Sequence, residues 1–161
     1  MKIGVISDTH IPERAPELPK EIYSAFKDVD LILHAGDLIT WDVLESLKKI
    51  GPVRAVYGNM DTPPVKSKLK EKEIIEAGNF KIGLIHGSGS PANLISFAKG
   101  AFEQKMDVIV FGHSHNPVNE KKSGILFFNP GSPTDTVFAP YKSYGILEIN
   151  DEIKSSIIKL L

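Results

Sequence analysis

The chain has 161 residues, of which 19 are Lys or Arg and 20 are Asp or Glu, so its formal net charge at pH 7 is −1. We expect residues 1–161 to form a single domain, because this length suits one folded unit with its own core. The balanced charge excludes a broad basic surface, and we expect no stable nucleic-acid complex. The absence of cysteine excludes disulfides, thiolate metal ligands and a cysteine nucleophile. We also expect a cytoplasmic protein without membrane contact, because no apolar run approaches the roughly 18 residues of a membrane span and no signal peptide is recognisable.

Short apolar runs alternate with helical patterns through the first two thirds of the chain. The runs at residues 3–6, 31–33, 53–57, 81–85 and 108–111 predict strands that are buried on both faces. Helices are predicted over 19–27, over 41–49 with Thr40 as N-cap, and from Ser90-Pro91 onward, where Leu94 and Ala98 share a face. This alternation favours βαβ units and a mostly parallel sheet.

The last third of the chain changes character. Four strand patterns at 118–121, 125–128, 143–149 and 153–160 follow one another with turn signals, such as Ser123-Gly124 and Asn150-Asp151, between them. We expect these strands to be antiparallel and to form or complete a second sheet. The predicted fold class is therefore α/β, a two-sheet β-sandwich flanked by α-helices.

Polar clusters follow five of the predicted strands. They are Ser7-Asp8-Thr9-His10, His34-Ala35-Gly36-Asp37, Gly58-Asn59-Met60-Asp61, His86-Gly87 and Gly112-His113-Ser114-His115. The carboxyl ends of parallel strands lie along one edge of a sheet, so we expect the clusters to meet in one crevice. Any one of these histidines is equally well explained as a satisfied core or turn residue, and only the ordered set favours a shared site.

The spacing within the clusters favours metal binding. Residues two apart in an extended segment point the same way, so Asp8 with His10, and His113 with His115, are each expected to face one centre. Glycines beside the clusters permit sharp turns and a close approach of the backbone. Asp, His and Asn donors without thiolates suit divalent Mn, Fe, Co, Ni or Zn.

The ordered motifs D-x-H, G-D, G-N-x-D, H-G and G-H-x-H, which run from Asp8 to His115, resemble the signature of the calcineurin-like metallophosphoesterases. The short chain, with Asp8-Thr9-His10-Ile11-Pro12 and Asn129-Pro130-Gly131-Ser132, is similar to the small phosphodiesterase branch of that superfamily, the YfcE-like group. The resemblance implies a two-sheet sandwich flanked by helices, which agrees with the order of the predicted elements. It also implies an enzyme, a hydrolase that acts on a small phosphodiester.

The resemblance assigns a role to each motif residue. It implies that Asp8, His10 and His115 hold a first metal, that Asn59, His86 and His113 hold a second, and that Asp37 bridges the two. Asp37 and Asn59 are then the catalytic candidates. The implied cofactors are two divalent ions, Mn first and Ni, Co, Fe or Zn as alternatives, with a bridging hydroxide as nucleophile. Two such ions, two carboxylates and a hydroxide leave about one positive charge, which a phosphodiester monoanion balances.

Other polar residues near the motifs have simpler explanations. We expect His34 to orient a ligand or to pack, rather than to bind metal, and Asp61 to support a turn rather than to transfer a proton. The charged run at 66–73 predicts a solvated surface segment. The amides of the loop at 87–91 are a weak candidate for phosphate contact. Trp41 either lines the pocket or packs beneath it.

Two other functions remain open: a phosphomonoesterase that uses the same site, and a metal-site protein-binding scaffold resembling the retromer subunit. The complete set of metal-competent residues disfavours the scaffold, and the charge balance disfavours a nuclease acting on long nucleic acid. Met60 follows the motif asparagine, where many metallophosphoesterases carry a histidine thought to protonate the leaving group, so the general acid is not identified. The resemblance also points to a homo-oligomer, with the apolar segment 153–161 at the contact.

Overall fold

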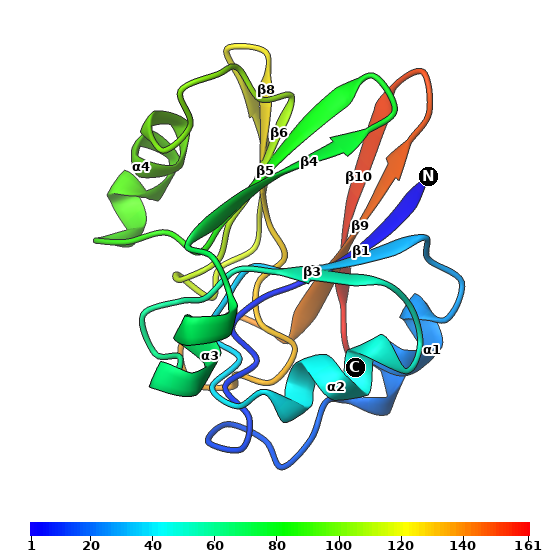
Figure 1. Cartoon of the computed structure of the whole chain (residues 1–161), viewed down its shortest axis with the longest axis vertical. Helices are drawn as coiled ribbons and strands as arrows, with labels where there is room; N and C mark the ends of the chain where they lie inside the picture. Colours follow the sequence, from blue (N-terminus) through cyan, green and yellow to red (C-terminus); the bar gives the residue numbers. More distant parts are fainter.

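Two β-sheets of five strands each pack face to face in the computed structural model, which describes all 161 residues (Figure 1). The first sheet has the strand order β10-β9-β1-β2-β3 and the second the order β4-β5-β6-β8-β7. The first sheet consists of β1 (Lys2–Ile6), β2 (Leu31–His34), β3 (Val53–Ala55), β9 (Ser143–Ile149) and β10 (Ile153–Lys159). The second consists of β4 (Lys72–Ala77), β5 (Phe80–Ile85), β6 (Val108–Val110), β7 (Val118–Lys122) and β8 (Ile125–Asn129). The predicted two-sheet sandwich is confirmed.

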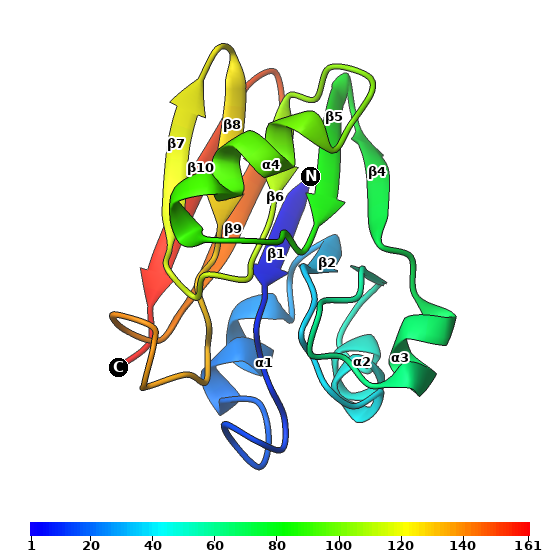
Figure 2. The same ribbon diagram turned by 90° about the vertical axis from the view of Figure 1, so that its left-hand side faces the viewer.

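Short helices cover the outer faces of the sandwich (Figures 1 and 2). They are α1 (Lys20–Phe26), α2 (Asp42–Lys48), α3 (Pro63–Lys68), the 3₁₀ turn η1 (Pro91–Asn93) and α4 (Leu94–Gly100). Helices α1 and α2 pack on the first sheet and α4 packs on the second. None of these helices has both the length and the apolar character that crossing a membrane requires.

Strand β1 shows why the central strands are apolar on both faces. Ile3 and Val5 point into the core between the sheets, whereas Ile6 belongs to the separate core under α1 and α2. Successive side chains of a strand face opposite ways, so a strand covered on both sides needs apolar residues throughout. A side chain at Gly4 would lie 2.7 Å from the Phe26 ring, so glycine allows α1 to pack directly on β1.

The predicted pairing of the last four strands is partly wrong. The β7–β8 hairpin is antiparallel and completes the second sheet, but β8 lies parallel to β6. The β9–β10 hairpin instead joins the first sheet, where β9 runs antiparallel to β1. The chain therefore crosses from one sheet to the other through residues 130–142, and strand spacing alone does not reveal such a crossing.

The prediction of a surface segment at residues 66–73 is confirmed, whereas that of Thr40 as a helix N-cap is wrong. The charged run at residues 66–73, whose residues are mostly exposed as predicted, contains the end of α3 and the start of β4. The strand signal is weak because β4 is an edge strand that buries only Ile75 and Ala77. Thr40 is not the N-cap of α2. Its hydroxyl instead donates to the carbonyl oxygen of Ile11 at 3.3 Å, which ties together the loops that follow β1 and β2.

Candidate metal centre

The five polar clusters meet where strands of both sheets end. Strands β1, β2 and β3 are parallel, as are β5 and β6, so their carboxyl ends open onto one side of the sandwich (Figure 2). A cleft of about 370 Å³ lies there. The structure brings all seven predicted ligand residues together: Asp8, His10, Asp37, Asn59, His86, His113 and His115. Five of them line the cleft, whereas Asp8 and His86 are buried beside it.

The first group consists of Asp8, His10 and His115, and it is buried. The Asp8 Oδ1 atom lies 3.3 Å from Nε2 of His115 and 3.9 Å from Nε2 of His10. Asp8 Oδ1 and His10 Nε2 have no hydrogen-bond partner. Buried polar atoms without partners are rare because each costs about 1–3 kcal/mol. A divalent cation between these donors would satisfy both atoms, so the residues fit a metal.

Asp37 lies between the two groups of candidate ligands. Its Oδ2 atom is 3.5 Å from Nε2 of His10 and 3.2 Å from Nε2 of His86. The other oxygen, Oδ1, accepts the backbone N–H of Met60 at 2.8 Å. One carboxylate oxygen is therefore fixed by the backbone while the other faces imidazoles from both groups, which suits a bridging ligand.

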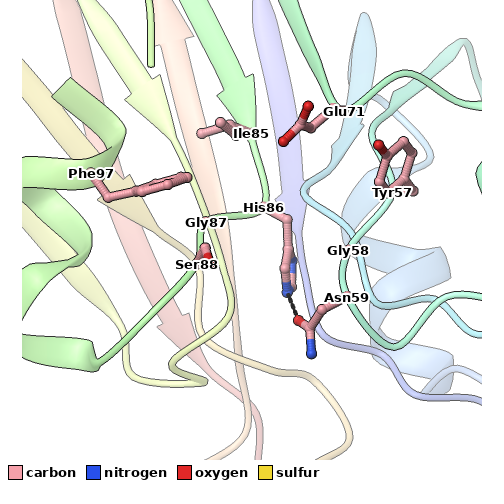
Figure 3. A pocket seen from close by; sticks show the side chains of 9 residues that line it. All are labelled: Tyr57, Gly58, Asn59, Glu71, Ile85, His86, Gly87, Ser88 and Phe97. Atoms are coloured by element: carbon pink, nitrogen blue, oxygen red, sulfur yellow. Dashed lines mark hydrogen bonds between the residues drawn. The ribbon is translucent and has the colours of Figure 1, made fainter. Parts of the chain in front are cut away.

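The second group of candidate ligands, Asn59, His86 and His113, converges on the side-chain oxygen of Asn59. That oxygen lies 3.1 Å from Nε2 of His86 (Figure 3). It also lies 3.2 Å from Nδ1 of His113. The remaining ring nitrogens face backbone oxygens: Nδ1 of His86 is 2.7 Å from Ala35 O, and Nε2 of His113 is 3.0 Å from Gly89 O. Because these carbonyl oxygens accept the ring N–H, each imidazole can present a lone pair to a common cation.

The backbone of the ligand loops is left-handed rather than extended. Asp8, His10, Asp37, His113 and His115 have φ angles of 56°, 43°, 57°, 70° and 58°. Such angles are unfavourable for residues other than glycine and cluster at functional sites. The expectation that His113 and His115 face one centre is therefore wrong, because His113 turns toward Asn59 and His115 toward Asp8.

Two glycines allow the loops to lie against the ligands. A side chain at Gly58 would collide with the carboxylate of Asp37, and one at Gly112 would collide with Ser7 and Asp8. Neither glycine has a positive φ, so close approach rather than turn geometry requires glycine at both positions.

His34 and Asp61 lie behind the candidate ligands. His34 accepts the N–H of Gly36 at 3.1 Å through Nδ1, and its Nε2 lies 3.1 Å from the hydroxyl of Thr9. Burial lowers the pKa of His34 to about 4, so this histidine is neutral and positions the loops.

The Asp61 carboxylate accepts three backbone amides, those of Asp37, Gly58 and Ile39, at 3.0, 2.7 and 2.7 Å. These contacts are those of a residue that supports a turn. Burial raises the pKa of Asp61, although the amides oppose the rise.

Sequence reasoning missed Asp135. Its carboxylate accepts a hydrogen bond from Nδ1 of His115 and also accepts the backbone N–H of Val137 at 2.8 Å. In the same segment, Ser132 and Thr134 donate their hydroxyls at 2.7 Å to the carbonyl oxygens of Asp8 and Thr9. The only available signal was a polar stretch after Asn129-Pro130-Gly131 that contains no strand or helix pattern.

The charges of the site oppose the effect of burial. Burial acts to raise the pKa of Asp8, but the surrounding imidazoles, His86 foremost, outweigh it and hold that pKa well below its usual range. Burial acts to lower the pKa of His86, but Asp8 and Asp37 raise it to about 9. Likewise the pKa of His115 is lowered by burial but raised to about 8 by Asp8 and Asp135. The carboxylates therefore favour positive charge here, whether it is carried by protons or by metal ions.

Two further predictions concern the surroundings of the site. Trp41 does not line the cleft; its ring packs against the core under α2, with the Nζ atoms of Lys48 and Lys68 4.8 and 4.5 Å from the ring centroid. The loop at 87–91 supplies the carbonyl of Gly89 that holds His113. A second cavity of about 160 Å³ lies beside Asn59 and His86, with Tyr57, Glu71 and Phe97 among its lining residues (Figure 3).

The similarity to known proteins covers the whole candidate site. The family model described as the calcineurin-like phosphoesterase superfamily domain matches residues 1–152. A probable metallophosphoesterase of Methanocaldococcus jannaschii is 42% identical over 165 residues, covering 99% of this chain and 82% of the relative. A phosphodiesterase of the same organism is 30% identical over 145 residues, covering 81% of this chain and 83% of the relative.

Solved structures share the fold. A Thermotoga maritima protein has a TM-score of 0.78 at 34% identity, covering 99% of both chains. The vacuolar protein sorting protein Vps29 of Entamoeba histolytica, solved with Zn²⁺, has a TM-score of 0.77 at 28% identity, again covering 99% of both chains. Since the family model spans nearly all of the sequence, including every candidate ligand, the chain belongs to the calcineurin-like phosphoesterase superfamily.

Proposed function

We propose that this protein is a phosphodiesterase that uses two divalent metal ions, Mn²⁺ in the first place, to hydrolyse a small phosphodiester. The observation that carries the proposal is the position of Asp37, whose Oδ2 lies within 3.5 Å of imidazole nitrogens from both ligand groups. A carboxylate placed in this way suits a bridge between two ions. The phosphodiesterase from M. jannaschii supports the reaction class.

The protein residues would hold the reacting groups in place. Asp8, His10 and His115 would bind one ion, Asn59, His86 and His113 the other, and Asp37 both. When bound, the ions supply a hydroxide nucleophile near neutral pH and stabilise the charge that develops on the phosphoryl oxygens. Backbone contacts from Ala35 and Gly89 fix the tautomers of His86 and His113, so their orientation does not depend on the substrate.

The charge of the site favours a diester over a monoester. With two ions, a hydroxide and the carboxylates of Asp8 and Asp37, the site carries about one positive charge, which a diester monoanion balances. Met60 lies on the cleft wall and is half-exposed, and its thioether has no proton to donate to a leaving group. We therefore propose highest activity toward diesters with good leaving groups, such as aryl or cyclic phosphodiesters.

A metal-site scaffold that binds another protein is the second candidate. It is favoured by the similarity to Vps29, a protein named for vacuolar protein sorting rather than for an enzymatic activity. Metal binding with no turnover of any phosphoester would select this alternative.

The test combines metal analysis with two matched substrates. We expect the Mn-loaded protein to hold two ions per chain and to hydrolyse bis(p-nitrophenyl) phosphate with a higher kcat/KM than p-nitrophenyl phosphate. Asp37→Ala should lower both metal content and turnover, whereas Asp42→Ala, an exposed carboxylate at the start of α2, is the control. Undiminished turnover after complete chelation would refute metal dependence, and a preference for the monoester would make the protein a phosphomonoesterase.

A further inference from the structure

The wall of the cleft beside the first ligand group carries an arginine and an aromatic ring. Arg14 is one of two arginines in the chain, and it lines the same 370 Å³ cleft as His10, His115 and Phe138. The Nη1 atom of Arg14 lies 3.9 Å from Oδ1 of Asp135, the residue whose other oxygen binds His115. The arginine is thus close to the candidate metal ligands without being one of them.

Phe138 is exposed but held in place. The residue is 65% exposed, which is unusual for one with so large an apolar side chain. The backbone N–H of Phe138 donates to Oδ2 of Asp135 at 3.2 Å, and Cζ of Arg14 lies 5.1 Å from the ring centroid. The His115 ring packs edge-on at 6.2 Å between centroids. The ring is therefore an apolar surface fixed beside the reacting centre, and fixing such a surface in advance lowers the cost of binding.

The neighbouring residue Val137 shows that exposure alone does not define this surface. Val137 is 66% exposed, almost the same as Phe138, yet it does not line the cleft. A surface for docking another protein would use both side chains. A subsite of the cleft would use only Phe138, together with Arg14.

We propose that Arg14 and Phe138 form a subsite for a nucleobase of the substrate. An aromatic side chain stacks on any base through its π-face, and the guanidinium offers N–H donors to the ring nitrogens and carbonyl oxygens of a base. The inference rests on the proposed function and narrows the substrate to nucleotide-type phosphodiesters. An aliphatic diester would leave both side chains unused.

Binding of product analogues tests the subsite without turnover. We expect the Zn-loaded protein to bind adenosine 5′-monophosphate about tenfold more tightly than ribose 5-phosphate in calorimetric titrations, as stacking on one aromatic residue provides. Saturation-transfer NMR should show the adenine protons, rather than the ribose protons, in closest contact. Phe138→Leu should abolish the difference in affinity and Phe138→Tyr should keep it.

Val137→Thr is the matched control, because it changes an equally exposed apolar side chain on the same loop. Equal affinities for the two ligands in the wild-type protein, or a preference that survives Phe138→Leu, would overturn the subsite. If bis(p-nitrophenyl) phosphate is hydrolysed in the same preparation, such a result overturns the subsite alone. Absence of hydrolysis in the fully metal-loaded protein overturns the proposed function instead, and with it the role of Arg14 and Phe138 in substrate binding.

Discussion

Replacing Asp135 by asparagine tests whether a residue outside the ligand set controls the first metal position. The Asp135 carboxylate accepts the Nδ1–H of His115, and its side chain is fully buried. Asparagine keeps the shape and one acceptor oxygen but loses the negative charge, and its amide can turn its NH₂ toward the imidazole. His115 would then lose both its fixed tautomer and part of the basicity that makes Nε2 a good ligand.

The magnitude follows from the role of such partners. Changing the hydrogen-bond partner of a metal-binding histidine costs about 10- to 100-fold in metal affinity, equal to about 1.4–2.7 kcal/mol. The loss should fall on one ion only. None of Asn59, His86 and His113 is hydrogen-bonded to Asp135. His86 and His113 take their orientation from the carbonyl oxygens of Ala35 and Gly89.

Competition titration with a chromophoric chelator measures the two affinities separately. We expect Asp135→Asn to weaken one binding step and to leave the other within about twofold of the wild type. Asp107→Asn is the matched control, because Asp107 also accepts a backbone amide, that of Lys81 at 2.8 Å, far from the cleft. Two unchanged affinities would refute the argument that Asp135 acts through His115, and equal losses at both steps would point to general damage to the fold.

Four further outcomes are expected of the site. His34→Gln should reduce turnover at saturating Mn²⁺ less than His86→Gln, because His34 contacts Thr9 and Gly36 rather than the candidate ligand atoms; the reverse order would mean that the ligand set is misassigned. The pKa values of His86 and His115 are raised to about 9 and 8, so both must lose protons to bind metal. Metal affinity should therefore rise with pH and level off only above about pH 9, and calorimetry in buffers of different ionisation enthalpy would show the proton release. Protonation of His86 and His115 also stabilises the metal-free fold, fully below about pH 6.5, and this stabilisation should be lost as the pH rises through about 8 and 9. Denaturant melts in which the metal-free protein becomes more stable over that pH range would contradict the raised pKa values. Met60→His should raise turnover of diesters with poor leaving groups by up to about 10²-fold and change bis(p-nitrophenyl) phosphate hydrolysis little, whereas equal gains on both would argue against a missing general acid.

The sequence predicted which candidate ligand residues lie close together but not the direction in which each side chain points. Asp8, Asp37 and His86 come together because parallel strands end on the same side, a rule that needs no side-chain detail. The divergence of His113 and His115 depends on left-handed backbone at both positions. Non-glycine residues adopt that conformation only when surrounding contacts impose it, so spacing gives no sign of it.

The rest depends on contacts between distant parts of the chain. Asp135 gains its role only because residues 130–142 carry the chain from β8 in one sheet to β9 in the other, past the loop that follows β1. The pairing of β9 with β1 joins the two ends of the sequence, and no local pattern distinguishes it from a hairpin added to the second sheet. Arg14 lies in the loop at residues 11–18, whose position predicts that it shapes the pocket but whose composition does not show which side chain faces the cleft.

The candidate ligands are divided between the two layers of the sandwich. Asp8, His10, Asp37 and Asn59 follow strands of the first sheet, while His86, His113 and His115 follow strands of the second. An ion shared by Asp37 and His86 would therefore cross-link layers that are otherwise joined mainly by apolar packing. At a free-ion concentration 100 times the dissociation constant, each independent ion would add about 2.7 kcal/mol to the free energy of unfolding. Resistance to heat and proteolysis should then follow the metal supply, and the separation of the two sheets at this end should be the first step that metal depletion accelerates.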